Sequence, residues 1–149
     1  MTDIRFYHLK TQTVEEALMP ILAKALSAGH RVVVKLADDK QVESVNEFLW
    51  VSRPDNFLPH GSAKDGHAED QPIWITSKDE NPNGAKVIIL GANALSDKIA
   101  EFTMACEMLP GHDEDGITAA RARWKTYKDA GHDVTYWQQT DAGGWEKKA

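Results

Sequence analysis

The sequence predicts an α/β fold with three layers, in which a mostly parallel sheet of about five strands carries helices on both faces. Three observations predict it. Short apolar segments alternate along the chain with segments of helical periodicity, an order that favours parallel strands joined by helices. The run VVV at residues 32–34 has no polar position, which is typical of a strand buried on both faces. With 149 residues, 42% apolar and 27% charged, the composition is that of an ordinary globular protein, so we expect one domain over residues 1–149.

Two strands and two helices are expected in the first third of the chain. Thr13 and Glu16, three residues apart, have the pattern of a capping box, which predicts the start of a helix. Gly29 then ends that helix. In chain order we expect a strand, a helix, a buried strand and a second helix at residues 4–8, 14–28, 31–36 and 38–50.

The pattern becomes less regular after residue 50. Residues 51–71 hold closely spaced turn formers and the polar stretch GSAKDGHAED, so we expect a long exposed loop. PIWIT at 72–76 and KVIIL at 86–90 predict two strands, joined by the turn-rich NPNG. The remaining elements are a helix, a helix ended by Gly131, a last strand and a loosened charged tail, at residues 97–109, 114–130, 133–138 and 139–149.

Charge and hydropathy exclude several classes of protein. The formal net charge of -6 disfavours broad binding to a phosphate backbone, which draws its affinity from many lysines and arginines. The opening MTDIRFYHLK lacks the apolar core of a secretory signal, and no apolar run approaches the ~20 residues of a membrane span. Cys106 is the single cysteine, which fits a reducing compartment. We therefore expect a cytoplasmic protein that does not enter a membrane.

An α/β sheet of this size invites a nucleotide-binding interpretation, because such folds bind ligands beyond the carboxyl ends of their strands. The motifs do not support it. The chain has no GxxxxGK[ST] pattern, and FYHLKTQT occupies the place after the first strand where GxGxxG would be expected. Gly91 after KVIIL is a single glycine, which more often lets a chain turn. A nucleotide- or metal-dependent small α/β enzyme is kept as the alternative function.

The polar loop after residue 59 contains the residues that could make the protein a metal-dependent enzyme. Its candidate ligands for zinc or manganese are two histidines and three acids: His60, His67, Asp65, Glu69 and Asp70. Their spacing matches no compact ligand motif, and a solvated loop explains them better. Cys106 in TMACEML is better explained as a small buried hydrophobe than as a nucleophile. We therefore expect no catalytic residue, no cofactor and no metal.

Positive charge is concentrated at residues 121–128, RARWKTYK, although the chain as a whole is acidic. On a helix, one side would carry residues from this stretch and the turn before it: Ile117, Ala120, Arg121, Trp124, Tyr127 and Lys128, with Lys125 at the margin. The apolar members could be a core stripe that the cations merely flank. Alternatively, Arg121 could pair with a carboxylate while Trp124 receives an apolar side chain, as in peptide capture. Stacking of single-stranded DNA bases on the two aromatic residues is a third possibility.

A second aromatic stretch is LWVSRPDNFLPHG at residues 49–61, where Trp50, Phe57 and Leu58 flank a proline-containing turn. The region is expected to be exposed. Large apolar groups in such a place either cover a sheet edge or form a surface for a partner protein. The pattern alone does not separate these two interpretations.

Five segments follow one another along the chain: FYHL, the LW…FLPHG segment, DQPIWIT, NPNGA and ARARWKTYKDAGHDVTYWQQ. In this order and at this spacing they resemble the chi subunit family of bacterial DNA polymerase III holoenzyme. Each motif is weak alone, but the ordered set is specific and spans essentially the whole chain. The resemblance implies a non-enzymatic accessory subunit of the clamp-loader assembly in the bacterial cytoplasm, with an NTPase-like sheet and no nucleotide site.

The resemblance also implies two protein partners and only indirect contact with DNA. One is the psi subunit, whose implied binding residues are Trp50, Phe57, Leu58, Pro59 and His60. The other is the acidic, Phe-ending C-terminal tail of single-stranded DNA-binding protein, whose implied binding residues are Arg121, Trp124, Lys125, Lys128 and Ile117. In this scheme Arg121 takes the terminal carboxylate, Trp124 the Phe ring and the lysines the acidic residues. Trp124 departs from family members with tyrosine there, and the ending GGWEKKA extends past the shortest members and has no assigned role.

Overall fold

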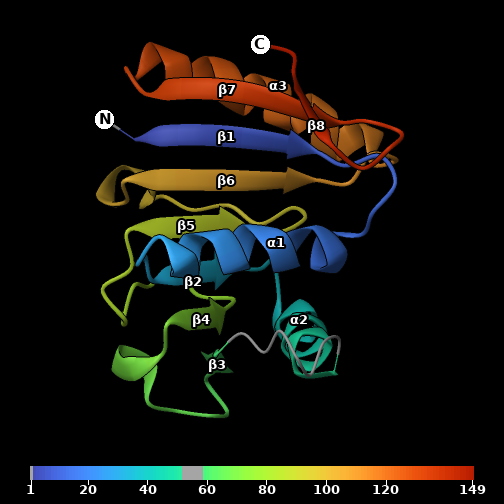
Figure 1. Cartoon of the computed structure of the whole chain (residues 1–149). Coiled ribbons are helices and arrows are strands. Elements are labelled where there is room, and N and C mark those ends of the chain that lie inside the picture. The colour runs from blue at the N-terminus through green and yellow to red at the C-terminus, as the bar shows by residue number, and fades with distance from the viewer. Residues whose placement is uncertain (1, 52–58) are drawn as a thin grey trace.

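A computed structural model of the chain describes residues 2–51 and 59–149 and shows a three-layer α/β arrangement (Figure 1). The α-helices are α1 (Val14–Ser27), α2 (Asp39–Val51) and α3 (Glu114–Asp129). Short 3-10 helices lie at Ala68–Asp70 and Ile99–Glu101. The strands are β1 (Asp3–His8), β2 (Val32–Lys35), β3 (Gly61–Ser62), β4 (Ile73–Thr76), β5 (Val87–Leu90), β6 (Met104–Leu109), β7 (Asp133–Gln139) and β8 (Trp145–Lys147).

The strands of the described residues form one eight-stranded sheet in the order β3-β4-β2-β5-β6-β1-β7-β8. Neighbouring strands are parallel from β3 to β7, and only β8 runs antiparallel to its neighbour β7. Helices α1 and α2 pack on one face and α3 on the other (Figure 1). The predicted fold class is confirmed, although the sheet has eight strands rather than about five.

The helix ends follow the local sequence closely. The side chain of Thr13 accepts a hydrogen bond from the backbone N–H of Glu16, and the carboxylate of Glu16 accepts one from the N–H of Thr13. This is the predicted capping box, and such a cap stabilises a helix by about 1 kcal/mol. Gly29 and Gly131 follow the C-cap residues of α1 and α3, and their positive φ angles of 82° and 90° are easily adopted only by glycine.

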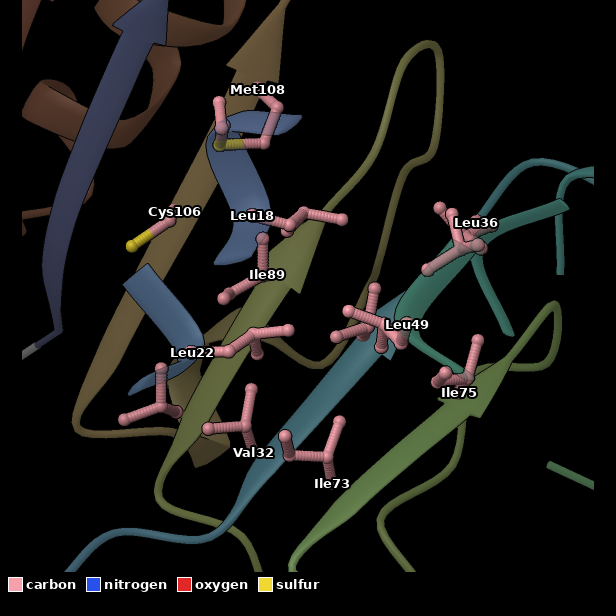
Figure 2. Packing of buried hydrophobic residues seen from close by; sticks show 14 of the residues in the cluster. Leu18, Leu22, Val32, Leu36, Leu49, Ile73, Ile75, Ile89, Cys106 and Met108 are labelled. Carbon is pink, nitrogen blue, oxygen red and sulfur yellow. The ribbon is translucent and has the colours of Figure 1, made fainter. Parts of the chain in front are cut away.

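The larger part of the core lies between the sheet and the helices α1 and α2 (Figure 2). Leu18 and Leu22 of α1 and Leu49 of α2 are buried against apolar side chains of the strands. Those strand residues include Val32, Ile73, Ile75, Ile89, Cys106 and Met108. Cys106 is buried as expected for a small hydrophobe, and burial raises the pKa of its thiol to about 12. It therefore stays protonated at neutral pH.

The prediction of a helix over residues 97–109 is wrong. Only a 3-10 turn forms at Ile99–Glu101, and Met104–Leu109 is β6, a central strand between β5 and β1. Its sequence MACEML consists mostly of good helix formers, which favours a helix on local propensity. Burial on both faces overrides that preference, since Cys106 packs under α1 while Ala105 faces α3.

Strands also form within two segments for which the sequence predicted none. The segment 51–71, expected as an exposed loop, contains β3, and His60 is buried just before it. The segment 139–149, expected as a loosened tail, contains β8. Trp145 of β8 packs edge-on against Tyr7 with ring centroids 4.9 Å apart, so a contact distant in sequence holds this strand on the sheet edge.

Candidate functional site

Helix α3 is fastened to the sheet by a buried acid. Glu107 of β6 is 1% exposed, and its carboxylate accepts hydrogen bonds from Arg123 at 2.6 Å and from the hydroxyl of Tyr127 at 2.8 Å. Burial is the largest single effect on the pKa of Arg123 and lowers it, but the hydrogen bond and negative charge of Glu107, together with Tyr127, outweigh burial and raise that pKa. Arg123 is thus an internal anchor, because a buried carboxylate needs a paired charge.

Because Glu107 holds one side of α3 against the sheet, another side of the helix faces solvent. Ala120 is fully buried beneath the helix, while Arg121, next in sequence, is exposed. Within the part of the chain that the structure describes, the guanidinium of Arg121 forms no hydrogen bond or ion pair with another residue. Two arginines two residues apart therefore have opposite roles: Arg123 holds the helix, and Arg121 presents its guanidinium to solvent.

Trp124 lies at the boundary between the core and the surface. Its ring is half-buried and packs near Phe6 and Tyr136, with centroid distances of 5.8 and 6.2 Å. The ammonium group of Lys128 lies 5.2 Å from the centroid of the same ring, in the range of a cation–π contact. The aromatic stripe therefore joins the core, as the first interpretation of the cationic helix expected, while Trp124 stays partly accessible to solvent.

A cavity of about 380 Å³ opens beside Arg121 and Trp124. Its other lining residues come from β1, β7 and the chain end after β8: His8, Tyr136, Gln138, Lys148 and Ala149. The volume is within the range of small-ligand sites. A guanidinium at the rim and aromatic rings in the wall suit a carboxylate attached to an apolar or aromatic group.

The polar pair in this cavity is kept largely uncharged. The hydroxyl of Tyr136 lies 2.9 Å from Nδ1 of His8. Burial lowers the pKa of His8. A hydrogen bond with the backbone of Gly111 raises it in part, and the nearby positive charge of Arg121 lowers it again, so the net shift is downward. Burial raises the pKa of Tyr136, which Arg121 partly offsets. Arg121 and Lys148 are therefore the positive charges that line the cavity at neutral pH.

The structure gathers some of the predicted site residues and separates others. Arg121 and Trp124 line the cavity, and Lys128 lies over the indole ring. Lys125 is exposed on α3 outside the lining, and Ile117 lines a different, small pocket of about 10 Å³ near Glu107. The other lining residues were not predicted from the sequence: His8, Tyr136, Gln138, Lys148 and Ala149. The alternation of Tyr136 and Gln138 along β7 was the one available signal that they share a face.

The second predicted surface lies at the far end of the sheet. Trp50, at the end of α2, is 52% exposed, and its neighbour Val51 is 68% exposed. The ring of Trp50 lies 5.0 Å from that of His60, which is buried, while Pro59 is exposed. The predicted partner-contact residues Phe57 and Leu58 lie outside the described residues.

Backbone N–H groups of the loop between β1 and α1 are hydrogen-bonded within the protein. The N–H groups of Lys10, Thr11 and Gln12 all point at the side-chain oxygen of Gln139, at 3.0, 3.0 and 3.3 Å. Gln139 is 2% exposed. In nucleotide-binding α/β folds the corresponding amides face phosphate groups. Here the amides bind the side-chain oxygen of Gln139 instead of a phosphate, which argues against a nucleotide-binding function.

In the described residues, the candidate metal ligands of the alternative function do not form a cluster. His60 is buried, whereas His67, Glu69 and Asp70 are exposed. Asp65 instead caps its own turn, because its carboxylate accepts a hydrogen bond from the N–H of Ser62 at 2.9 Å. Across residues 2–51 and 59–149, no three His, Cys, Asp or Glu side chains are grouped to hold a metal ion. Nor does any helix in those ranges have the length and apolar character to cross a membrane.

Comparisons with known proteins agree on one family. The family model described as "DNA polymerase III chi subunit, HolC" matches residues 1–135. The "DNA polymerase III subunit chi" of Escherichia coli (strain K12) is 26% identical over 142 residues, which cover 90% of this chain and 96% of that protein. The protein of the same name from Haemophilus influenzae is 25% identical over 128 residues, covering 84% and 87%.

A third relative is similar over a shorter segment. The "Probable DNA polymerase III subunit chi" of Rickettsia prowazekii (strain Madrid E) is 31% identical over 90 residues. That alignment covers 60% of this chain and 54% of the Rickettsia protein. The resemblance noted from the five ordered sequence motifs is thus confirmed by independent comparisons.

Proposed function

The chain belongs to the DNA polymerase III chi subunit family, and from that premise we propose that it is a non-catalytic adaptor of the replicative polymerase. In this proposal it joins the psi subunit of the clamp-loader assembly to the acidic C-terminal tail of single-stranded DNA-binding protein, and reaches DNA only through those partners. The observation that carries the proposal is the cavity in which Arg121, without an internal partner among the described residues, stands beside the accessible edge of Trp124.

The tail would dock by its last residue. The Phe ring enters the cavity against Trp124 and Tyr136, and the terminal carboxylate pairs with Arg121. Burying a Phe side chain contributes roughly 1.5–3 kcal/mol, whereas an exposed ion pair contributes about 0–1 kcal/mol. The ring and the carboxylate therefore dominate the affinity, while Lys125 and Lys128 mainly attract the preceding acidic residues. Ile117 stays in the binding set on the strength of the family resemblance alone, because it lines the small pocket near Glu107 and not this cavity.

The psi subunit would bind at the opposite end of the sheet. Trp50 and Val51 form an exposed apolar surface there, bordered by Pro59 and His60, with Phe57 and Leu58 included on the strength of the family resemblance. Figure 1 shows α2 and β3 at one end of the sheet, and α3 and β7 at the other. Two partners could therefore bind at the same time, which is what an adaptor requires.

Calorimetric titration with a short acidic peptide ending in Phe tests the proposal. We expect wild-type protein to bind with a Kd on the order of micromolar, about 8 kcal/mol. Arg121→Ala should weaken binding at least tenfold, since it removes the partner of the terminal carboxylate. The same peptide with a C-terminal amide is the matched control, and it should bind the wild type as weakly as the acid binds the variant. Equal affinities for all three combinations would refute the proposed pocket.

A further inference from the structure

We propose that residues 140–149 form the second wall of the Arg121–Trp124 cavity, and that Lys148 supplies a second cation to an acidic peptide docked there. The family match ends at residue 135, so it does not cover this segment. The inference rests on the proposed function, because it concerns the same peptide in the same cavity. It assigns a role to an ending that the sequence motifs left unexplained.

The segment is held in place by several independent contacts. A turn closes after β7, where the N–H of Thr140 donates to the carbonyl of Gly144 at 2.7 Å and Gly143 adopts a φ of 90°. β8 then pairs with β7, with Trp145 opposite Gln139. Trp145 packs on Tyr7 and joins the core on the α1 face of the sheet. Residues 140–149 therefore have the anchoring expected of a fixed wall.

The segment continues past β8 along the strand that lines the cavity. The N–H of Lys148 donates to the carbonyl of Tyr136 at 2.8 Å, and the N–H of Tyr136 donates to the carbonyl of Ala149 at 3.1 Å. Both Lys148 and Ala149 line the cavity. Arg121 lines the same cavity from α3. A peptide in the cavity would therefore lie between cations contributed by two elements.

Lys147 and Lys148 lie on opposite faces of the sheet. Successive side chains of a strand point to opposite faces. Trp145 lies on the α1 face, so Lys147 shares that face, and Glu146 and Lys148 lie on the α3 face with the cavity. The ammonium group of Lys148 is 3.3 Å from the carboxylate of Glu146, and both side chains are solvent-accessible. Glu146 thus offsets part of the charge that Lys148 offers to a peptide.

The arrangement predicts effects of opposite sign within three consecutive residues. Titration with the acidic, Phe-ending peptide should show binding about two- to fivefold weaker for Lys148→Gln, the effect of one exposed ion pair. Glu146→Gln should tighten binding by about twofold, because it removes a competing carboxylate. Lys147→Gln is the matched control: it makes the same change in net charge as Lys148→Gln but on the other face, and it should leave the Kd unchanged.

Release of the whole wall should have a larger effect. Trp145→Ala removes the contact with Tyr7, and we expect the peptide to bind at least fivefold more weakly as the segment detaches from the sheet edge. Circular dichroism of the variant checks that the rest of the chain is folded. If Trp145→Ala does not fold, the three charge variants decide alone.

Arg121→Ala, measured in the same series, separates the two levels of the proposal. Loss of binding in Arg121→Ala with unchanged Kd in Lys148→Gln would overturn the second wall and leave the tail pocket standing. An equal loss in Lys147→Gln and Lys148→Gln would also overturn it, since the effect would then reflect net charge alone. Unchanged binding in Arg121→Ala would overturn both.

Discussion

The two ends of the sheet offer two different kinds of surface. At the α3 end, a cavity of about 380 Å³ combines the exposed guanidinium of Arg121 with the edge of a half-buried indole. At the α2 end, Trp50 and Val51 stand out from the surface, 52% and 68% exposed. A recess with a charged rim suits the end of a flexible chain, whereas projecting apolar groups suit a folded partner that buries them. The difference shows how one small domain could bind two unlike partners without competition.

The ends also differ in how they are stabilised. The α3 end adds two polar anchors to its own apolar cluster: the carboxylate of Glu107, which binds α3, and the amide of Gln139, which binds the loop after β1. The side that carries α1 and α2 depends on a continuous apolar cluster (Figure 2). A buried polar anchor fixes geometry closely but is costly to break on one side. The α3 end should therefore be the more sensitive to single polar substitutions.

The largest expected effect is that of Glu107→Ala. It leaves the guanidinium of Arg123 and the hydroxyl of Tyr127 without their acceptor, and breaking such a pair should lower the free energy of unfolding by about 3 kcal/mol. Urea unfolding measures the change. Glu101→Ala, at an exposed acid on the 3-10 turn, is the control and should cost less than about 0.5 kcal/mol. A loss below 1 kcal/mol for Glu107→Ala would show that α3 is held by its apolar contacts instead.

Gln139→Ala should have the next largest effect. The substitution deprives three backbone N–H groups of one shared acceptor, although water can reach part of this loop, so we expect a loss of about 2 kcal/mol in the free energy of unfolding. The matched control is Gln138→Ala, the neighbouring glutamine on the opposite face of β7, which should cost less than about 0.5 kcal/mol. Equal losses in the two variants would remove the special role given to Gln139.

A third substitution sharpens the contrast in function. Trp50→Ala should weaken binding of the psi subunit by about 2 kcal/mol, roughly thirtyfold, as expected for a central aromatic contact. The Kd for the acidic peptide should not change, because Trp50 and the cavity lie at opposite ends of the sheet. Arg121→Ala should show the reverse selectivity. Pull-down and calorimetry with both ligands would reveal a shared site if either variant weakened both.

The smallest expected effect concerns pH. The pKa of His8 in the folded protein is lowered, mainly by burial, from the unfolded value of about 6.5. Just below pH 6.5 the ring therefore stays neutral in the folded state while it becomes protonated in the unfolded state. The contribution of His8 to stability is therefore complete above pH 6.5 and declines as the pH falls through the window down to its folded pKa. NMR titration of the ring should show that lowered pKa, and a bound peptide carboxylate should raise it. An unmoved His8 pKa in the complex would place the carboxylate elsewhere.

The order of most elements could be predicted because their signals are local. The capping box of Thr13 and Glu16 and the apolar run at residues 32–34 need no knowledge of the rest of the chain. β6 could not be predicted that way, because its helix-forming residues become a strand only through burial between β5 and β1. β8 depends likewise on the contact of Trp145 with Tyr7, at the other end of the sequence.

The candidate site was predictable only in part for the same reason. Periodicity placed Arg121 and Trp124 on one side of a helix, which the structure shows. It could not tell that Arg123 is an internal anchor, because its partner Glu107 lies in the segment expected to be a helix. The cavity residues His8 and Lys148 come from strands at opposite ends of the chain, so only the assembled sheet brings them together.

Trp124 is the residue proposed to receive the end of an acidic peptide. The most direct test follows the indole N–H resonances of the protein by NMR while the Phe-ending peptide is added. We predict that the Trp124 signal shifts in step with saturation while the Trp50 signal, at the far end of the sheet, stays in place. Saturable binding that leaves the Trp124 signal unmoved would contradict the account.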